Sequence, residues 1–223
     1  MPRVVFSRSI SIPWWLTHSR SMKPFAESSE QNKLPILEVL RRYLSNVESV
    51  LEIGSGTGQH AVYFARQFPS LQWYTSDLKE NHAGILAWIE EAQLPNVHAP
   101  ILLDVKQKDW GSQQYDVLFS ANTAHIMDWP GVTHMFRGAG HVLRPGGLFC
   151  LYGPFNYDGL YTSESNARFD HWLKTRDPAS GIRDFEAVCQ LAENNDMRLV
   201  EDHPMPANNR TLVWKKQLSE KEG

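Results

Sequence analysis

Residues 50 to 58 read Val-Leu-Glu-Ile-Gly-Ser-Gly-Thr-Gly, and this stretch decides how the rest of the chain is organised. Strand-forming residues run directly into three glycines at alternate positions, and a helical pattern follows from Gln59. Without side chains at Gly54, Gly56 and Gly58, the backbone can turn sharply from a strand into a helix and stay open to a ligand. The stretch therefore predicts a ligand-binding turn after a first strand. The alternative is a glycine-rich turn that binds nothing.

The glycine spacing separates two kinds of nucleotide site. A dinucleotide-binding turn follows G-x-G-x-x-G, whereas here the third glycine comes one residue early and Gln59 holds the expected glycine position. Glu52 would repel a pyrophosphate, but its carboxylate suits a positively charged ligand. The pattern Glu-x-Gly-x-Gly-x-Gly resembles the first motif of class I methyltransferases that use S-adenosylmethionine (SAM), a donor with positive amino and sulfonium groups. We include Ser55, inside this pattern, among the expected cofactor-binding residues.

Composition limits the class of protein. A chain of 223 residues with 42% hydrophobic content suits one domain with one core. The net charge of -3 argues against a protein that mainly binds nucleic acid. Cys150 and Cys189 are far apart, and the histidines show no metal-binding spacing, so neither a disulfide nor a metal site is expected. No apolar run approaches the ~20 residues that cross a bilayer, which predicts a cytoplasmic protein without a membrane partner.

The ends of the chain differ from its middle. Residues 1–26 contain arginines and serines but no acid, as mitochondrial presequences do, although Pro13 and the Trp14-Trp15 pair disfavour an amphipathic helix. We expect a poorly ordered extension there, and Met22 as the natural start stays an alternative. A single domain is expected over residues 27–217, with a substrate lid around residues 154–183 and a charged tail over residues 218–223.

Apolar strand patterns alternate with helical ones, which predicts an α/β fold. The expected strands are residues 50–53, 71–76, 97–103, 115–120, 148–153, 197–202 and 211–215. The expected helices start at Ser28 or Ser29, which can cap the first one, at Gln59, and near residues 85, 132 and 185, with a short one around residues 169–173. The last two strands are expected to form an antiparallel pair.

Acidic residues follow two further strands. Asp77 lies 21 residues beyond Gly56, close to the ~20 at which an acid receives ribose hydroxyls in a nucleotide-binding unit, and Leu78 follows it. The alternative for Asp77 is a loop aspartate that caps a helix. Asp104 can accept the amino group of adenine while Val105 offers its backbone N–H to the ring. These residues are expected at one edge of the sheet.

A helix, the turn Arg144-Pro145-Gly146-Gly147 and an apolar strand form a second motif that resembles methyltransferases. From Lys23 to about Gln217 the chain is similar to class I SAM-dependent methyltransferases, and most similar to the poorly characterised methyltransferase-like 26 proteins and their bacterial relatives. The strings that carry this closer resemblance are residues 30–33, 35–37, 153–155, 162–166, 169–170, 176–178, 181–186 and 205–209.

The resemblance implies a Rossmann-like fold. Its sheet would have seven mostly parallel strands in the order 3-2-1-4-5-7-6, with helices on both faces and SAM across the carboxyl ends of the first four strands. Glu52 and the three glycines would face the methionine part of SAM and Asp77 the ribose. Asp104 and Val105 would face adenine, and Asn122 would supply the backbone under the sulfonium. The product would be S-adenosylhomocysteine.

The catalytic candidates are less firmly indicated than the cofactor site. His125 follows the fourth strand and would overhang the methyl group, so it is the first candidate for a general base, with a plain loop histidine as the alternative. Asp128 and Tyr157 are weaker candidates. The segment after the fourth strand, Asn122-Thr123-Ala124-His125, lacks the prolines and the aromatic of amino-methylating DNA enzymes, which disfavours a nucleic-acid base as substrate.

Charged and amide side chains in the lid and the last turn are substrate candidates. Arg176 or Arg183 could hold a carboxylate or phosphate, with Asp184 nearby, unless these charges pair with one another to order the lid. Asn208 and Asn209 could donate to a substrate or bridge the turn.

Three functions remain open. The favoured one is a SAM-dependent methyltransferase of a small molecule. The others are a protein or RNA methyltransferase and a non-catalytic SAM sensor or scaffold. A nicotinamide dehydrogenase is disfavoured by the glycine spacing. The sequence predicts no oligomeric state.

Overall fold

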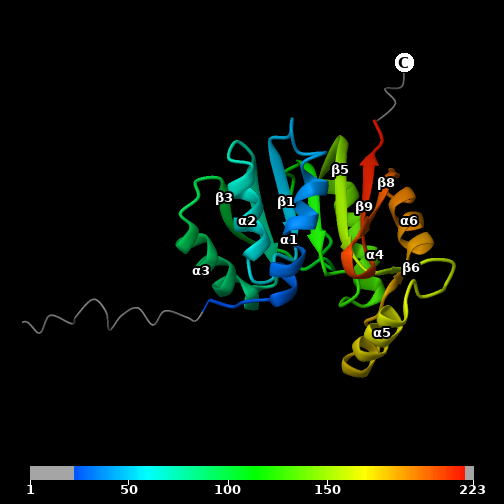
Figure 1. Cartoon of the computed structure of the whole chain (residues 1–223). Helices are drawn as coiled ribbons and strands as arrows, with labels where there is room; N and C mark the ends of the chain where they lie inside the picture. Colours follow the sequence, from blue (N-terminus) through cyan, green and yellow to red (C-terminus); the bar gives the residue numbers. More distant parts are fainter. Residues whose placement is uncertain (1–22, 219–223) are drawn as a thin grey trace, which may run out of the picture.

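The computed structural model describes residues 23–218 and contains a seven-stranded sheet (Figure 1). Its strands are β1 (Ser49–Ile53), β2 (Gln72–Asp77), β3 (Val97–Leu102), β4 (Tyr115–Ala121), β5 (Leu143–Gly153), β8 (Met197–Met205) and β9 (Asn209–Lys216). They lie in the order β3-β2-β1-β4-β5-β9-β8, in which β9 pairs antiparallel with β5 and β8 and the other pairs are parallel. Because β8 and β9 are the sixth and seventh strands of this sheet, the expected order 3-2-1-4-5-7-6 is confirmed.

Helices cover both faces of the sheet, as expected of the fold (Figure 1). One face carries α1 (Glu27–Leu40), α2 (Gln59–Gln67) and α3 (His82–Ala92), and the other carries α4 (Trp129–Val142) and α6 (Phe185–Glu193). The remaining elements are α5 (Glu164–Arg176), the paired short strands β6 (Phe155–Asn156) and β7 (Arg183–Asp184), and the one-turn helices η2 (Lys79–Asn81) and η3 (Pro206–Asn208). In Figure 1, α5 lies below the sheet, apart from the two helical layers.

The core follows from strand alternation. Val50 packs into the cluster of α1 and α2, which contains Phe64, and the next residue, Leu51, packs into the cluster of α4 and α6, which contains Phe136. Successive strand side chains point to opposite faces, so a strand between two helical layers is apolar at nearly every position. This explains why the strands read as continuous apolar runs. Glu52 is the exception, because it is a fully buried acid within β1.

Several local expectations are corrected. No side chain caps α1, which begins after Ala26, whereas Ser28 or Ser29 was expected to do so. The helix expected to be short around residues 169–173 is the 13-residue α5, whose first turn is capped by Ser163 as its hydroxyl accepts from the Asn166 backbone N–H at 3.1 Å. β5 begins at Leu143 rather than Leu148, because residues 144–147 form an irregularity inside the strand.

The folded domain begins earlier than expected. Lys23 to Ala26 were assigned to a poorly ordered extension, but Trp88 of α3 donates its indole N–H to the Pro24 carbonyl at 2.8 Å, and the Lys23 ammonium lies 3.6 Å from the centre of the Trp88 ring. The first residues before α1 are therefore packed on α3. The expectations about residues 1–22 and 219–223 fall outside the described residues. Within residues 23–218, no helix has the length and apolar character that spanning a membrane requires.

We predict that Gly58→Ala destabilises the fold more than Gly111→Ala. Both glycines have positive φ, 91° and 86°, where any other residue is strained by about 1 to 2 kcal/mol. A Cβ on Gly58 would also lie 3.0 Å from the Ile85 backbone of α3, whereas a Cβ on Gly111 meets nothing within 4 Å. In urea unfolding, the free energy of unfolding should therefore fall more for Gly58→Ala than for Gly111→Ala. An equal fall for both variants would contradict tight packing of α3 on the turn.

Candidate functional site

The three glycines of the turn after β1 have positive φ angles of 72°, 58° and 91°, but they serve different purposes. The Gly54 N–H and the Ser55 N–H both donate to the Ser76 carbonyl of β2, at 3.0 and 2.9 Å. A Cβ on Gly54 would lie 2.7 Å from the Thr123 methyl group, whereas a Cβ on Gly56 would meet nothing within 4 Å. Gly56 is thus the glycine that leaves the backbone open, as the sequence predicted for the whole turn.

A cavity of about 630 Å³ lies at the carboxyl ends of β1, β2 and β4. We call it the strand-end cavity. Most of the residues expected to bind a cofactor line it, namely Gly54, Ser55, Gly56, Asp77, Leu78, Asp104, Val105 and Asn122. Residues that the sequence did not single out also line it, namely Ala26, Ser28, Ser29, His60, Asn81, Lys106, Ile126 and Met127. Two expected residues, Glu52 and Gly58, do not line the cavity, so their assignment to it is corrected.

Glu52 lies beneath the turn and is 2% exposed. Its Oε2 atom accepts from the Ser55 hydroxyl at 3.0 Å and from the Trp73 indole N–H at 3.1 Å. Burial raises the pKa of the Glu52 carboxyl to about 7, although these two hydrogen bonds oppose the shift. Glu52 therefore supports Ser55 from below and does not itself line the cavity.

Asp77, at the end of β2, binds the glycine turn directly. Its Oδ2 atom accepts from the Gly56 backbone N–H at 2.7 Å. Its Oδ1 atom accepts from the Leu78 backbone N–H at 2.7 Å and from the Asn81 amide at 2.8 Å. The side chain also lines the cavity, so the lone pair that Oδ2 retains can accept from a ligand hydroxyl. Asn81, which fixes the carboxylate, has no signal in the sequence beyond its position four residues after Asp77.

Asp104 and Val105 form another side of the strand-end cavity with apolar neighbours. Asp104 Oδ1 accepts from the Lys106 backbone N–H at 2.9 Å, which holds the carboxylate beside the cavity. Leu103, Ile126 and Met127 supply apolar surface there. A flat apolar ring with an amino group would fit between this surface and the carboxylate.

Asp128 has a structural use that the sequence analysis did not assign. It precedes α4, where its Oδ1 accepts from the Gly131 backbone N–H at 2.9 Å while its Oδ2 pairs with the Lys106 ammonium at 2.7 Å. The Lys106 bond and then the Gly131 bond keep the pKa of the Asp128 carboxyl below its usual value. Both oxygens are engaged, so a catalytic role for Asp128 is not supported. The sequence Asp-Trp-Pro-Gly carried the signal of a helix cap.

A second cavity of about 510 Å³ adjoins the first and shares Ser28 and Asn122 with it. We call it the amide cavity. It lies between α1, the segment after β4, the end of β5, α5 and the turn before β9. Its other lining residues are Gln31, Asn32, Pro35, His125, Tyr152, Pro154, Ser165, Asn166, Phe169, Pro206, Ala207 and Asn209. Asn122 has a φ of 59° and its backbone N–H donates to Tyr152, which fixes the partition between the two cavities.

His125 lines the amide cavity and is 6% exposed. Its ring meets Phe169 edge-on, with centroids 5.3 Å apart, and its backbone carbonyl accepts from the Gly181 N–H at 2.9 Å. Burial, and then the nearby Arg183 charge, lower the pKa of His125 to about 4, so the imidazole is neutral at pH 7. No hydrogen bond to this ring is formed by any residue from 23 to 218, which leaves a ring nitrogen able to accept a proton.

Tyr157 is not at either cavity. Its hydroxyl donates to Asp202 at 2.7 Å, and its ring stacks on Phe185 with centroids 4.9 Å apart. Burial and the Asp202 bond raise the pKa of the phenol far above its usual value. The expectation of a catalytic Tyr157 is therefore corrected to a packing role.

Arg176 and Arg183 of the lid line neither cavity. Arg176 lies over the Trp172 ring, with its guanidinium carbon 4.6 Å from the centroid. Arg183 donates to the carbonyls of Ala124, Met127 and Ala179, and so ties the lid to the segment after β4. The expectation that an arginine binds substrate is corrected. The alternative expectation was that the charged residues of the lid pair with one another. Arg183 instead orders the lid by donating to backbone carbonyls and not to carboxylates.

Of the other substrate candidates, only Asn209 lines a cavity. Asp184 is an exposed residue at the start of α6 and makes no capping bond with its side chain. Asn208 donates its amide to the Ser165 hydroxyl at 3.2 Å and does not line the amide cavity. Asn209 lines it and donates its amide to the Pro206 carbonyl at 3.2 Å.

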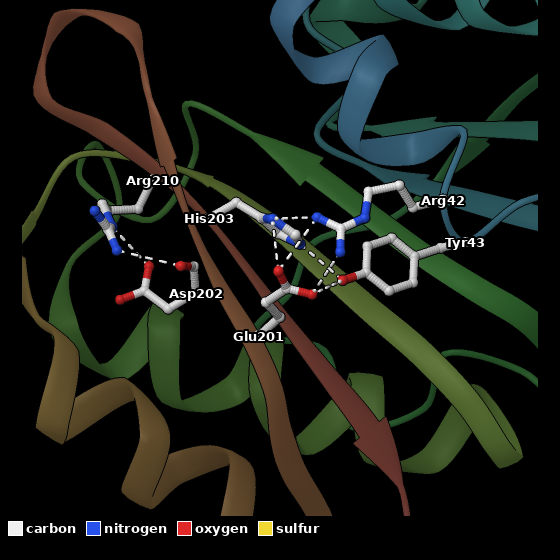
Figure 2. Close-up of polar contacts among 6 residues, drawn as sticks. All are labelled: Arg42, Tyr43, Glu201, Asp202, His203 and Arg210. Atoms are coloured by element: carbon white, nitrogen blue, oxygen red, sulfur yellow. Dashed lines mark hydrogen bonds and ion pairs between the residues drawn. The ribbon is translucent and has the colours of Figure 1, made fainter.

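A polar cluster fixes the turn that carries Asn209 (Figure 2). Arg42, just after α1, pairs with Glu201 of β8 at 3.1 Å, and the Tyr43 hydroxyl lies 2.7 Å from His203 Nε2. On the far side of β8, the Arg210 side chain pairs with Asp202 at 2.6 Å. The β8–β9 hairpin is therefore held to the end of α1. The contacts of Arg42 and Tyr43 with β8 join residues about 160 positions apart, so local sequence patterns could not reveal them.

Among residues 23–218 there is no group of three or more histidine, cysteine, aspartate or glutamate side chains placed to hold a metal ion. A family model described as "Protein of unknown function (DUF938)" matches residues 23–216, which is most of the chain. The protein belongs to the DUF938 family.

The fold of the DUF938 protein is similar to that of solved methyltransferases. An O-methyltransferase family protein from Burkholderia thailandensis matches with a TM-score of 0.76 and 14% identity, over 86% of this chain and 58% of that one. The SAM-dependent methyltransferase SibL matches with a TM-score of 0.73 and 21% identity, over 85% and 56%. An O-methyltransferase family 2 protein from Planctomyces limnophilus, solved with apigenin, matches with a TM-score of 0.72 and 14% identity, over 85% and 60%.

These likenesses establish a shared class I fold. The DUF938 protein spans a little over half the length of the solved chains that it matches. At such low identity the site residues must be argued from the chain itself.

We predict that Glu52→Gln makes the stability of the DUF938 protein less sensitive to pH. The Glu52 pKa is raised from 4.5 to about 7 in the folded state, so its stabilising contribution is complete below pH 4.5 and is lost as the pH rises through 7. We compare the free energies of unfolding of the Gln variant and the native protein, measured in urea. Their difference should shift by about 2 kcal/mol in favour of the variant when the pH is raised from 5 to 8. Any effect of the substitution on packing is the same at both pH values and cancels in this comparison. The same difference in unfolding free energy at pH 5 and pH 8 would contradict a raised pKa of Glu52.

Proposed function

We propose that the DUF938 protein is a methyltransferase that binds SAM in the strand-end cavity and transfers its methyl group to a small molecule. The observation that carries this proposal is Asp77, whose carboxylate binds the open Gly56 backbone and at the same time lines the cavity. A carboxylate at the end of the second strand is suited to accept a ribose hydroxyl, and the remaining lone pair of Asp77 Oδ2 is available for one. The class I fold and the resemblance to the methyltransferase-like 26 proteins support the same function.

The charges around the strand-end cavity favour a positively charged donor over a dinucleotide. Asp77, Asp104, Asp128 and Asp177 line it, and Lys106 is the one lysine or arginine among its lining residues. Lys106 is already paired with Asp128. The carboxylates would repel a pyrophosphate, and no unpaired lysine or arginine of residues 23–218 lines the cavity to offset that repulsion. The same carboxylates would attract the sulfonium and ammonium groups of SAM. The residues present therefore fit SAM better than a nicotinamide cofactor.

Each part of the donor has a fitting residue in this proposal. Asp77 would hold the ribose, with Asn81 fixing the carboxylate. Asp104 would accept the adenine amino group, and Leu103, Ile126 and Met127 would pack on the ring. The Gly54 to Gly56 backbone and Asn122 would border the methionine part. When bound, SAM supplies a methyl group on a positively charged sulfur.

His125 is the proposed general base. It lines the amide cavity, next to the Asn122 partition, and it is neutral with an unpaired ring nitrogen. A neutral imidazole there could take the proton that an O–H or N–H acceptor loses during methylation. A protein that only senses SAM would need no such base, so the role of His125 separates an enzyme from a sensor.

Calorimetry tests the proposed cofactor. We expect SAM and S-adenosylhomocysteine to bind and NADH not to bind. We further predict that Asp77→Asn weakens SAM binding by ~1.5 to 3 kcal/mol, the scale of a hydrogen bond to a charged group. Glu80→Gln is the matched control, because Glu80 is an exposed acid three residues later that does not line the cavity. Binding of NADH alone, or equal affinities for the two variants, would count against the proposal.

For His125 we predict that His125→Gln lowers the rate of methyl transfer about 100-fold or more while SAM affinity changes less than twofold. Because protonation inactivates a base, the rate of the native protein should fall only as the pH drops towards the lowered pKa of about 4 and should be flat from pH 6 to 8. The measurement is transfer of labelled methyl groups at several pH values. An unchanged rate in the variant would remove His125 from the mechanism.

A further inference from the structure

The amide cavity is lined by no ionic side chain of residues 23–218, although 21% of the residues in the chain are charged. None of its lining residues is an aspartate, glutamate, lysine or arginine. Its histidine, His125, is uncharged at pH 7, and the arginines of the lid are directed elsewhere. An ionic group that entered such a cavity without a partner would lose several kcal/mol of hydration. The cavity therefore selects against carboxylates, phosphates and ammonium groups.

Two amides of the cavity have a definite orientation. Asn166 directs one end of its amide at the Asn208 carbonyl oxygen, at 3.2 Å, and Asn209 directs one end at the carbonyl oxygens of Pro206 and Ala207, at 3.2 and 3.5 Å. A backbone carbonyl only accepts, so in both residues the end that faces it must be the NH2 group. The opposite end of each amide is therefore the carbonyl oxygen.

These two oxygens lack a donor. No N–H or O–H group within residues 23–218 donates to Asn166 Oδ1 or Asn209 Oδ1, and neither atom is among the buried polar atoms without a partner, so both remain accessible. Both residues line the amide cavity. The cavity thus offers two free hydrogen-bond acceptors, which suit a ligand that supplies N–H or O–H donors.

The remaining walls are flat and apolar. Phe169 is held in place by Trp172, on which it stacks with centroids 5.8 Å apart, and it contacts His125 edge-on. Pro35, Pro154 and Pro206 add rigid apolar faces. Flat walls at a volume of about 510 Å³ suit a planar molecule of small-ligand size.

We propose that the amide cavity binds the methyl acceptor, and that the acceptor is an uncharged planar ring compound whose N–H or O–H groups donate to Asn166 and Asn209. This inference rests on the proposed methyltransferase function. In the reaction, a bond forms between an oxygen or nitrogen of the ring compound and the methyl carbon. The bond from that carbon to sulfur breaks with its electron pair going to sulfur, and the proton of the attacking group goes to His125.

The test uses the full chain, labelled SAM and a cell extract. Small molecules of the extract are divided at pH 7 into a fraction retained by an anion exchanger, a fraction retained by a cation exchanger and an unretained, neutral fraction. We expect labelled methyl groups to enter the neutral fraction. Label confined to an ionic fraction or to macromolecules would overturn the inference, as would no label at all from a protein that binds SAM. A protein that does not bind SAM by calorimetry would instead overturn the proposed function.

Two neighbouring variants locate the effect in the cavity. Asn209→Ala removes one of the free oxygens. We expect it to raise the KM for the neutral acceptor about 3- to 10-fold, which corresponds to the loss of one neutral hydrogen bond. Asn208→Gly is the control, because Asn208 does not line the cavity and glycine tolerates its φ of 58°. Equal effects of both variants on KM, with unfolding midpoints unchanged, would overturn the role of the Asn209 oxygen.

Discussion

The structure depends on the hydrogen bond between the Asp77 carboxylate and the Gly56 backbone N–H, at 2.7 Å. It joins the ends of two adjacent parallel strands, because Gly56 follows β1 and Asp77 ends β2. A carboxylate that accepts two backbone N–H groups and an asparagine amide is held in one orientation. The Asp77 carboxylate therefore lines the strand-end cavity in one fixed orientation.

The two cavities divide the chemistry between them. The strand-end cavity is acidic and suits a positively charged donor, and the amide cavity is uncharged and suits a neutral acceptor. They meet at Asn122, whose left-handed backbone lies between them. Such a division allows two different molecules to be placed side by side without competing for one site, and alignment of this kind can supply most of the rate of a methyl transfer.

The sequence predicted the fold because its signals are local. Glycine spacing, strand runs and helical stripes act over a few residues, and all seven strands and their order follow from them together with the resemblance. Gly56 and Asp77, which line the strand-end cavity, could be singled out from the sequence for the same reason. The helix-cap role of Asp128 was not assigned, although its pattern was present in the sequence.

The remaining errors concern contacts between distant segments. Glu52 was expected at the ligand, but Trp73 and Ser55 hold it under the turn, which no pattern in residues 50–58 could indicate. Tyr157 and Arg183 were assigned by position in the lid, yet their partners, Asp202 and the carbonyls after β4, are 45 and up to 59 residues away. The amide cavity is assembled from five separate segments, so its neutral character became visible only in three dimensions.

The most direct measurement of the central claim is a crystal structure of the chain with S-adenosylhomocysteine. The account predicts the adenosine in the strand-end cavity, with a ribose hydroxyl within hydrogen-bond distance of Asp77 Oδ2 and the Gly56 N–H still bound to the same carboxylate. A ligand in the amide cavity or on another surface, with the Asp77 carboxylate untouched, would contradict the account.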